Sequence, residues 1–147
     1  MSQHTAQNVN GSGLQRLRVY QDSLELEQAV FELTRDIGSK NFYPAGNTLR
    51  RHAAAIAHYI AESNNRYSYR LKLESLHLAR SRADQLRLAL KSYDDTTPQI
   101  TQSLQDKSAL ISRQLWGLIL SYKKRQQEHL HATRADATDA LVAARAM

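Results

Sequence analysis

Apolar residues recur at alternating steps of four and three along four stretches of this chain. In the stretch from Asn47 to Asn65 they are Leu49, Ala53, Ile56 and Ile60. This spacing places them on one face of an amphipathic helix. The small residues between them make that helix thin, so that neighbouring helices can approach it closely. The pattern therefore predicts a helix from about residue 48 to residue 63, with the other three stretches packed on it.

The other three stretches carry the same period. They run from about residue 17 to 37, from about 68 to 93, and from 98 to at least 126. Their apolar faces consist of Val19, Ser23, Leu26, Val30, Leu33 and Ile37, of Leu76, Ala79, Ala83, Leu86 and Leu90, and of Leu104, Ser108, Ile111, Leu115, Leu118 and Tyr122. Short connections imply antiparallel neighbours. The sequence predicts an all-α fold, namely an antiparallel up-down-up-down four-helix bundle.

Start signals define two of these helices. Residues 40–46 are expected to form a loop, after which Asn47 or Thr48 would cap the second helix through a short side-chain oxygen. Thr97 as N-cap with Pro98 at the first helical position marks the start of the fourth helix. Outside the helices, we expect a disordered arm over residues 1–13.

The division of the chain follows from these patterns. The bundle domain is expected over residues 14–128. Residues 129–147 are Ala-rich and weakly patterned, which predicts a flexible or weakly helical tail. If the fourth helix ends near residue 126, the run of residues 123–125, Lys-Lys-Arg, complements the helix dipole. Gly117 in the interior of that helix costs about 1 kcal/mol relative to Ala, which indicates that another backbone comes close to it.

Composition excludes several classes of protein. The 147 residues are 41% hydrophobic and include no Cys, so the chain has no thiolate metal site and no Cys nucleophile. It has no Gly-rich phosphate loop and no nucleophile elbow, and we expect no enzymatic activity. The longest strongly apolar run, residues 115–120, is far shorter than the roughly 18 residues of a membrane span. The N-terminus lacks the apolar core of a secretory signal, so we expect a cytoplasmic protein without membrane contact.

The charge balance is basic, with 20 Lys and Arg against 14 Asp and Glu, and gives a net charge of +6. Such an excess suits a partner that bears phosphates. It also keeps small domains soluble, so composition alone leaves both interpretations open.

Several short motifs occur in an order that points to a family. They are Leu17-x-Val19-Tyr20-Gln21, Leu49-Arg50-Arg51 before a small-residue helix that ends Ile60-Ala61-Glu62, and Leu115-Trp116-Gly117-Leu118-Ile119. This order resembles the four-helix bundle proteins encoded in intervening sequences of 23S ribosomal RNA genes. The accessory variability proteins (Avd) of diversity-generating retroelements belong to the same broad family. The resemblance covers roughly Leu14 to Lys124; it departs at Ser63, where the family usually has Gly.

The resemblance implies a non-enzymatic, cytoplasmic bundle that assembles into a barrel-like homopentamer and holds no cofactor. In the retroelement branch, such a barrel binds a reverse transcriptase and its template RNA through basic surfaces. In the ribosomal branch the role is not established, and the alternative function is that of a protein–protein interaction module.

A basic stripe on the third helix is the best candidate binding site. Seven Lys and Arg residues lie between positions 66 and 91 against two acidic residues. If the helix is regular from Arg66 onward, the stripe occupies a narrow sector beside the apolar face, although a solvated helix flank would show the same pattern. The residues expected to bind RNA or DNA are Arg50, Arg51, Arg66, Arg70, Arg80, Arg87 and Lys91, with His77 on the same stripe.

Arg50 and Arg51, at the start of the second helix, also have a structural alternative. One of them is expected to pair with an acidic residue of the first helix, such as Glu32 or Asp36. In that case it would hold two helices together and would not contact a phosphate.

Apolar residues outside the four core faces are candidates for oligomer or partner contacts. They are Leu71 and Leu78 on the third helix and Trp116 and Leu120 on the fourth. Two Glu-x-x-His pairs, Glu74/His77 and Glu128/His131, match one part of the ferritin-like di-metal pattern. The first pair faces away from the core and the second lies beyond it, so we expect no metal site.

Overall fold

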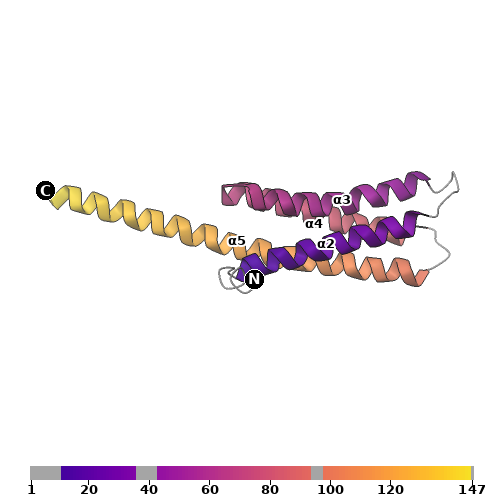
Figure 1. Cartoon of the computed structure of the whole chain (residues 1–147). Helices are drawn as coiled ribbons and strands as arrows, with labels where there is room; N and C mark the ends of the chain where they lie inside the picture. Colours follow the sequence, from indigo (N-terminus) through magenta and orange to yellow (C-terminus); the bar gives the residue numbers. More distant parts are fainter. Residues whose placement is uncertain (1–10, 36–42, 94–97, 147) are drawn as a thin grey trace, which may run out of the picture.

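In the computed structural model, the described residues are 11–35, 43–93 and 98–146. They form four helices: α2 (Gly11–Arg35), α3 (Tyr43–Asn65), α4 (Tyr69–Lys91) and α5 (Pro98–Ala146). None of these residues forms a strand. Figure 1 shows α2, α3, α4 and the first part of α5 lying side by side as a bundle. The predicted four-helix bundle is confirmed.

The helices are arranged as a four-membered ring. In the described part of the chain, α2 packs on α3, α3 on α4, α4 on α5, and α5 on α2, whereas the diagonal pairs make no contact. Successive helices are therefore neighbours and run in opposite directions (Figure 1).

The core contains the residues that the periodicity predicts. Leu49, Ala53, Ile56 and Ile60 of α3 are all buried, and so are Leu76, Ala79, Ala83, Leu86 and Leu90 of α4. The same holds for the predicted face of α5, where buried Ser108 donates a hydrogen bond from its Oγ to the carbonyl oxygen of Ala83 (2.6 Å). On α2, Ile37 lies outside the described residues and Leu33 is only half-buried.

The start of α3 differs from the prediction. The helix begins at Tyr43, so Asn47 and Thr48 lie inside it and do not cap it. Pro44 stands in the first turn, where a missing backbone N–H costs nothing. Gly46 follows and is buried, and a Cβ built on it would meet the side chain of Thr34 at 3.5 Å. The expected loop of residues 40–46 is therefore wrong for residues 43–46, and residues 40–42 lie outside the described residues.

The cap of α4 explains where that helix begins. Ser68 is the N-cap, and its side chain accepts a hydrogen bond from the backbone N–H of Leu71 (3.2 Å). Arg66 and Tyr67 precede this cap and are exposed in the link from α3. At the start of α5, the expected cap Thr97 lies outside the described residues.

The fourth helix is far longer than predicted. It is continuous from Pro98 to Ala146, and residues 127–146 are all exposed. At about 1.5 Å per residue this part extends roughly 30 Å beyond the bundle (Figure 1). The segment expected to be flexible or weakly helical is therefore part of α5. Of the expected disordered arm, residues 11–13 form the first turn of α2 and the remainder lies outside the described residues.

Candidate nucleic-acid interface

The basic stripe predicted on the third helix divides into two parts. Arg70, Arg80, Arg87 and Lys91 lie on α4, where all but Arg80 are exposed. Arg66 lies before the N-cap of α4 and forms an ion pair with Glu62 at the end of α3. The assumption of a regular helix from Arg66 onward is wrong, because Ser68 starts the helix two residues later.

Trp116 of α5 connects the stripe to the neighbouring helix. The guanidinium carbon of Arg80 lies 4.6 Å from the centre of the Trp116 ring, and the Lys123 ammonium lies 5.6 Å from it. Both distances are within the range of cation–π contacts. Trp116 is 37% exposed, and its ring lies where α4 and α5 meet. We call Arg70, His77, Arg80, Trp116 and Lys123 the α4/α5 groove.

Two hollows run along this groove and meet at His77. The first, of about 510 Å³, is lined by Arg70, Leu73, Glu74, His77, Lys123 and Gln126. The second, of about 300 Å³, is lined by His77, Arg80, Ser81, Asp84, Gln85 and Leu88. Together they extend along α4 from Arg70 to Leu88. Arg70 and Lys123 line the first hollow beside Glu74, and Arg80 lines the second beside Asp84.

The groove has a positive electrostatic character. The pKa of His77 is lowered, first by partial burial and then by the charges of Lys123 and Arg80. Among the described residues, none of Arg70, Arg80 or Lys123 takes part in an ion pair. Asp84 accepts a hydrogen bond from Ser112 Oγ (2.8 Å). The nearby cations therefore remain available to an external anion.

Arg80 is half-buried and incompletely bonded. Its Nε is buried and has no hydrogen-bond partner, while its guanidinium group packs on the Trp116 ring. A buried donor without a partner is costly. A phosphate oxygen arriving beside the guanidinium group would give Arg80 the acceptor that it lacks.

The structure places Arg50 away from the groove. Its Nε donates to Thr34 Oγ1 (2.6 Å) and its Nη2 to the Thr34 carbonyl oxygen (3.1 Å). That carbonyl belongs to the last turn of α2, whose final carbonyls have no donor within the helix. The Arg50 guanidinium carbon also lies 4.7 Å from the centre of the Phe31 ring. Arg50 therefore joins α3 to the end of α2.

The prediction that one of these arginines holds the first two helices together agrees with the contact of Arg50 to Thr34, whereas the predicted pairing with Glu32 is wrong. Glu32 forms an ion pair with Arg35 (3.5 Å), and Asp36 lies outside the described residues. Arg51 is exposed, and its charge is one of the causes that lower the pKa of His52, after burial and the charge of Arg82.

Among the groove residues, Trp116 was predicted to contact a partner, and Lys123 was not assigned to nucleic-acid binding. Lys123 had been interpreted as a charge at the end of the fourth helix, but α5 continues to Ala146, so the dipole argument does not apply. The sequence does contain a sign of this role, because Lys123 follows Trp116 by seven residues and therefore lies on the same side of the helix.

The apolar candidates for partner contact are partly exposed. Leu78 and Leu120 are 43% and 48% exposed, and Leu71 is half-buried. Gly117 is exposed, and a Cβ built on it would meet nothing within 4 Å. The predicted close approach of another backbone to Gly117 is wrong within this chain.

The described residues contain no group of three or more His, Asp or Glu side chains that could hold a metal ion. None of the four described helices is long and apolar enough to cross a membrane.

The fold is similar to that of a solved protein. A protein of unknown function of the S23 ribosomal protein family from Bacteroides thetaiotaomicron superposes with a TM-score of 0.65. The two chains are 18% identical, and the match covers 71% of this chain and 97% of the other. This likeness shows a shared fold. No protein-family model and no curated protein matches the chain.

Proposed function

We propose that this protein is a non-enzymatic scaffold that binds single-stranded RNA or DNA in the α4/α5 groove. The observation that carries the proposal is the Trp116 ring beneath Arg80 and Lys123, in a groove whose cations have no ion-pair partner among the described residues. Cations bind the phosphates, and the exposed part of the aromatic ring stacks on a base.

Single strands fit this groove better than duplexes do. Stacking on an aromatic side chain requires a base that is free of its own stack, as in loops and single strands. The cations of α4 continue past the groove to Arg87 and Lys91, which are exposed on the same stripe. A strand that enters at Arg70 would therefore follow the length of α4.

The assembly and the biological partner form the finer part of the proposal. We infer from the family resemblance that the chain forms a homopentamer and serves as the accessory variability protein of a diversity-generating retroelement. Repetition of the groove around a ring would concentrate the positive potential. The mass of the assembly by light scattering, and co-purification with the reverse transcriptase encoded nearby, test this part.

A second candidate function is a protein–protein interaction module of the ribosomal branch. The exposed apolar side chains of Leu78 and Leu120, together with the projecting part of α5, favour it. A contact of this kind buries apolar area and depends little on salt. The affinity for a nucleic acid, in contrast, falls steeply as the salt concentration rises.

The test is retention of labelled single-stranded RNA on a filter by the double variant Arg80→Glu/Arg87→Glu. We expect affinity to fall by about two orders of magnitude, because two cations are lost and two repulsive charges are gained. The matched control is Arg18→Glu/Arg134→Glu, which changes net charge equally at exposed positions of α2 and of the projecting part of α5. Circular dichroism checks that both variants remain helical. Wild-type affinity in the groove variant, or equal losses in both variants, would refute the proposal.

A further inference from the structure

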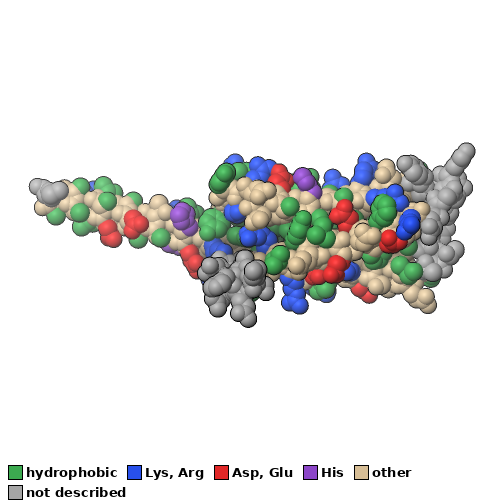
Figure 2. Space-filling view, viewed as in Figure 1, with side chains coloured by type: hydrophobic (Ala, Val, Ile, Leu, Met, Phe, Trp, Pro, Cys, Tyr) green, Lys and Arg blue, Asp and Glu red, His purple; other side chains and the backbone are tan. Residues whose placement is uncertain are grey.

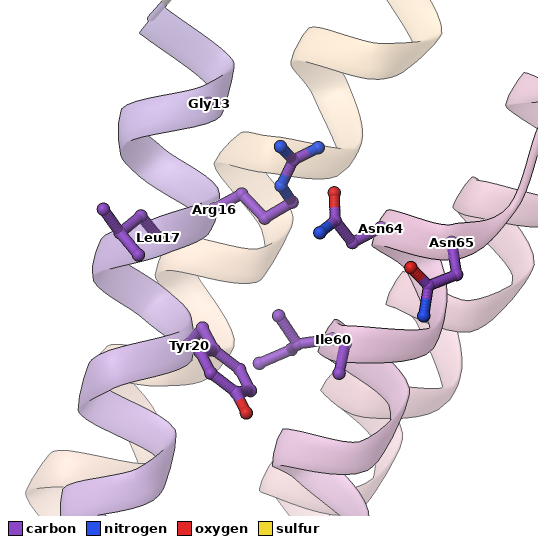
Figure 3. A pocket seen from close by; sticks show the side chains of 8 residues that line it. Gly13, Arg16, Leu17, Tyr20, Ile60, Asn64 and Asn65 are labelled. Carbon is purple, nitrogen blue, oxygen red and sulfur yellow. The ribbon is translucent and has the colours of Figure 1, made fainter. Parts of the chain in front are cut away.

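A separate pocket lies between α2 and α3, at the end of the bundle from which α5 projects. Its volume is about 380 Å³, within the range of small-molecule sites. Figure 3 shows Arg16 of α2 and Asn64 of α3 extending toward one another across it, with Tyr20 and Ile60 facing each other nearby. Asn65 contributes a second amide to the α3 side. The pocket uses neither α4 nor the α4/α5 groove.

The pocket combines an apolar floor with a polar rim. Ile60 is 1% exposed and closes the bottom of the pocket, whereas the half-buried ring of Tyr20 offers the flat apolar surface. The amides of Asn64 and Asn65 are exposed, and each can donate and accept hydrogen bonds. This division suits a molecule that has one flat apolar part and one polar edge.

Arg16 is held in place at one side of the pocket. Its Nη1 donates a hydrogen bond to the hydroxyl oxygen of Tyr122 on α5 (2.9 Å). A guanidinium group carries five N–H donors in a planar fork, so this single bond fixes the group and leaves further donors for an anion. No carboxylate of the described residues forms an ion pair or a hydrogen bond with Arg16.

Two further cations, Lys72 and Arg125, lie at this end of the bundle but do not line the pocket. Lys72 of α4 donates a hydrogen bond from its Nζ to the carbonyl oxygen of Ser63 (3.2 Å), which directly precedes Asn64. The pKa of Lys72 is lowered, first by burial and then by the charge of Arg16. The guanidinium carbon of Arg125 lies 5.8 Å from the centre of the Tyr122 ring. Figure 2 shows Lys and Arg side chains gathered between α3 and α2 at this end of the bundle.

Like charges that are held together without an acidic partner cost free energy, and a bound anion would remove that cost. The described ion pairs include none of Arg16, Lys72 or Arg125. An anion bound at Arg16 would reduce the repulsion between Arg16 and Lys72, and it would lie beside the ring of Tyr20. The chemistry of the site is therefore that of an aromatic organic anion.

We propose that this pocket binds a nucleoside monophosphate group, either as a free nucleotide or as the terminal nucleotide of an RNA strand. The phosphate would bind the free donors of Arg16, the base would lie against Tyr20 and Ile60, and the edge of the base would meet the amides of Asn64 and Asn65. This inference goes beyond the proposed function, because the pocket lies on different helices and can act without the groove.

The test is calorimetric titration of the full chain with AMP and UMP, alongside adenosine and inorganic phosphate. We expect both nucleotides to bind about tenfold or more tightly than either of their parts, because only a nucleotide fills both halves of the pocket. Arg16→Gln should reduce nucleotide affinity about tenfold through loss of a charge-assisted contact. Tyr20→Leu should weaken it while the floor stays apolar. The matched control Arg18→Gln, at an exposed position two residues further along α2 and on roughly the opposite side of the helix, should bind as the wild type does.

The source of the nucleotide is distinguished with RNA oligonucleotides that carry a 5′-phosphate or a 5′-hydroxyl. If the wild type binds the 5′-phosphorylated RNA more tightly and Arg16→Gln loses this preference, the pocket is assigned to RNA ends. Binding of AMP or UMP without such a preference would assign it to free nucleotides. The Arg80→Glu/Arg87→Glu variant should keep its nucleotide affinity, so failure of the groove and failure of the pocket are separable. If neither nucleotides nor RNA ends bind, or if Arg16→Gln binds as the wild type does in a correctly folded protein, the inference is overturned.

Discussion

Two arginines of this bundle make the same contact and have different surroundings. Arg50 lies over Phe31 at 4.7 Å and Arg80 lies over Trp116 at 4.6 Å. Arg50 also donates twice to Thr34, so its polar groups are used within the fold. Arg80 has a buried Nε without a partner. The comparison shows that the neighbours of a cation–π pair decide whether the pair supports the fold or remains open to a ligand.

The difference extends to the surrounding charges. In the α4/α5 groove, Arg80 is joined by Lys123 on the same ring and lies beside His77, whose pKa their charges lower. Around Arg50, the neighbouring acid Glu32 is paired with Arg35 at the end of α2. One arginine thus completes a helix end, and the other belongs to an accumulation of positive charge.

The strongest test of this comparison measures the stability and the RNA affinity of an alanine variant of each arginine. Arg50→Ala should lower the free energy of unfolding by about 2 kcal/mol, because it leaves the Thr34 carbonyl without a donor and removes the contact with Phe31. RNA affinity, measured where the variant is fully folded, should not change. Arg80→Ala should do the reverse, with about tenfold weaker RNA binding and little loss of stability. Urea unfolding and filter binding on both variants give the four values. Equal behaviour of the two variants would show that the distinction is false.

The ring beneath Arg80 gives the next largest effect. Trp116 is the only tryptophan of the chain, so its fluorescence reports on the α4/α5 groove alone. Single-stranded RNA should change that fluorescence, and Trp116→Leu should weaken RNA binding by about 1–2 kcal/mol through the lost stacking. Leu120→Ala, four residues further along α5, serves as the control for loss of an exposed apolar side chain. Saturating RNA that leaves the emission of Trp116 unaltered would argue against a stacked base.

Substitution of Gly117 should change stability without changing RNA binding. Its place in α5 is open, so Ala there should meet no obstacle and should raise the free energy of unfolding by about 1 kcal/mol. RNA binding should remain as in the wild type, because the change adds no charge and removes no aromatic ring. A destabilised Gly117→Ala variant would mean that another chain packs closely on this position in the assembled protein.

The smallest effect concerns pH. Because the pKa of His77 is lowered from 6.5, the folded protein takes up fewer protons here than the unfolded chain, and stability declines as pH falls below 6.5. RNA phosphates favour the protonated ring, so RNA affinity should increase about two- to threefold as pH falls from neutral toward the pKa of His77. His77→Gln should remove this increase. Loss of stability at low pH through His52, whose pKa is also lowered, would remain in that variant.

The core could be predicted from sequence because burial follows the period of a single helix. Leu76, Ala83 and Leu90 lie on the buried face of α4 for the same reason that they recur at steps of seven. The exposed arginines of α4 were predictable in the same way. Each of these residues has a position that its own helix determines.

The groove could be predicted only in part, because it is a property of two helices. The contact between Arg80 and Trp116 depends on how α4 and α5 are rotated against one another. The apolar period of either helix alone does not determine that rotation. Lys123 was misassigned because the Ala-rich segment after residue 128 has high helix propensity but no apolar period, so the end of α5 was placed too early. Arg66 was included because the capping role of Ser68 was not recognised.

The measurement that tests the central claim most directly is the salt dependence of RNA affinity for the wild type and for Arg80→Glu/Arg87→Glu. For single strands, the slope of log K against log salt is about −0.7 per phosphate neutralised. The five Lys and Arg residues of the groove and the stripe predict a wild-type slope of about −3.5, and the double variant should be shallower by at least about 1.4. A slope near zero, or one that the double variant leaves unchanged, would contradict the account.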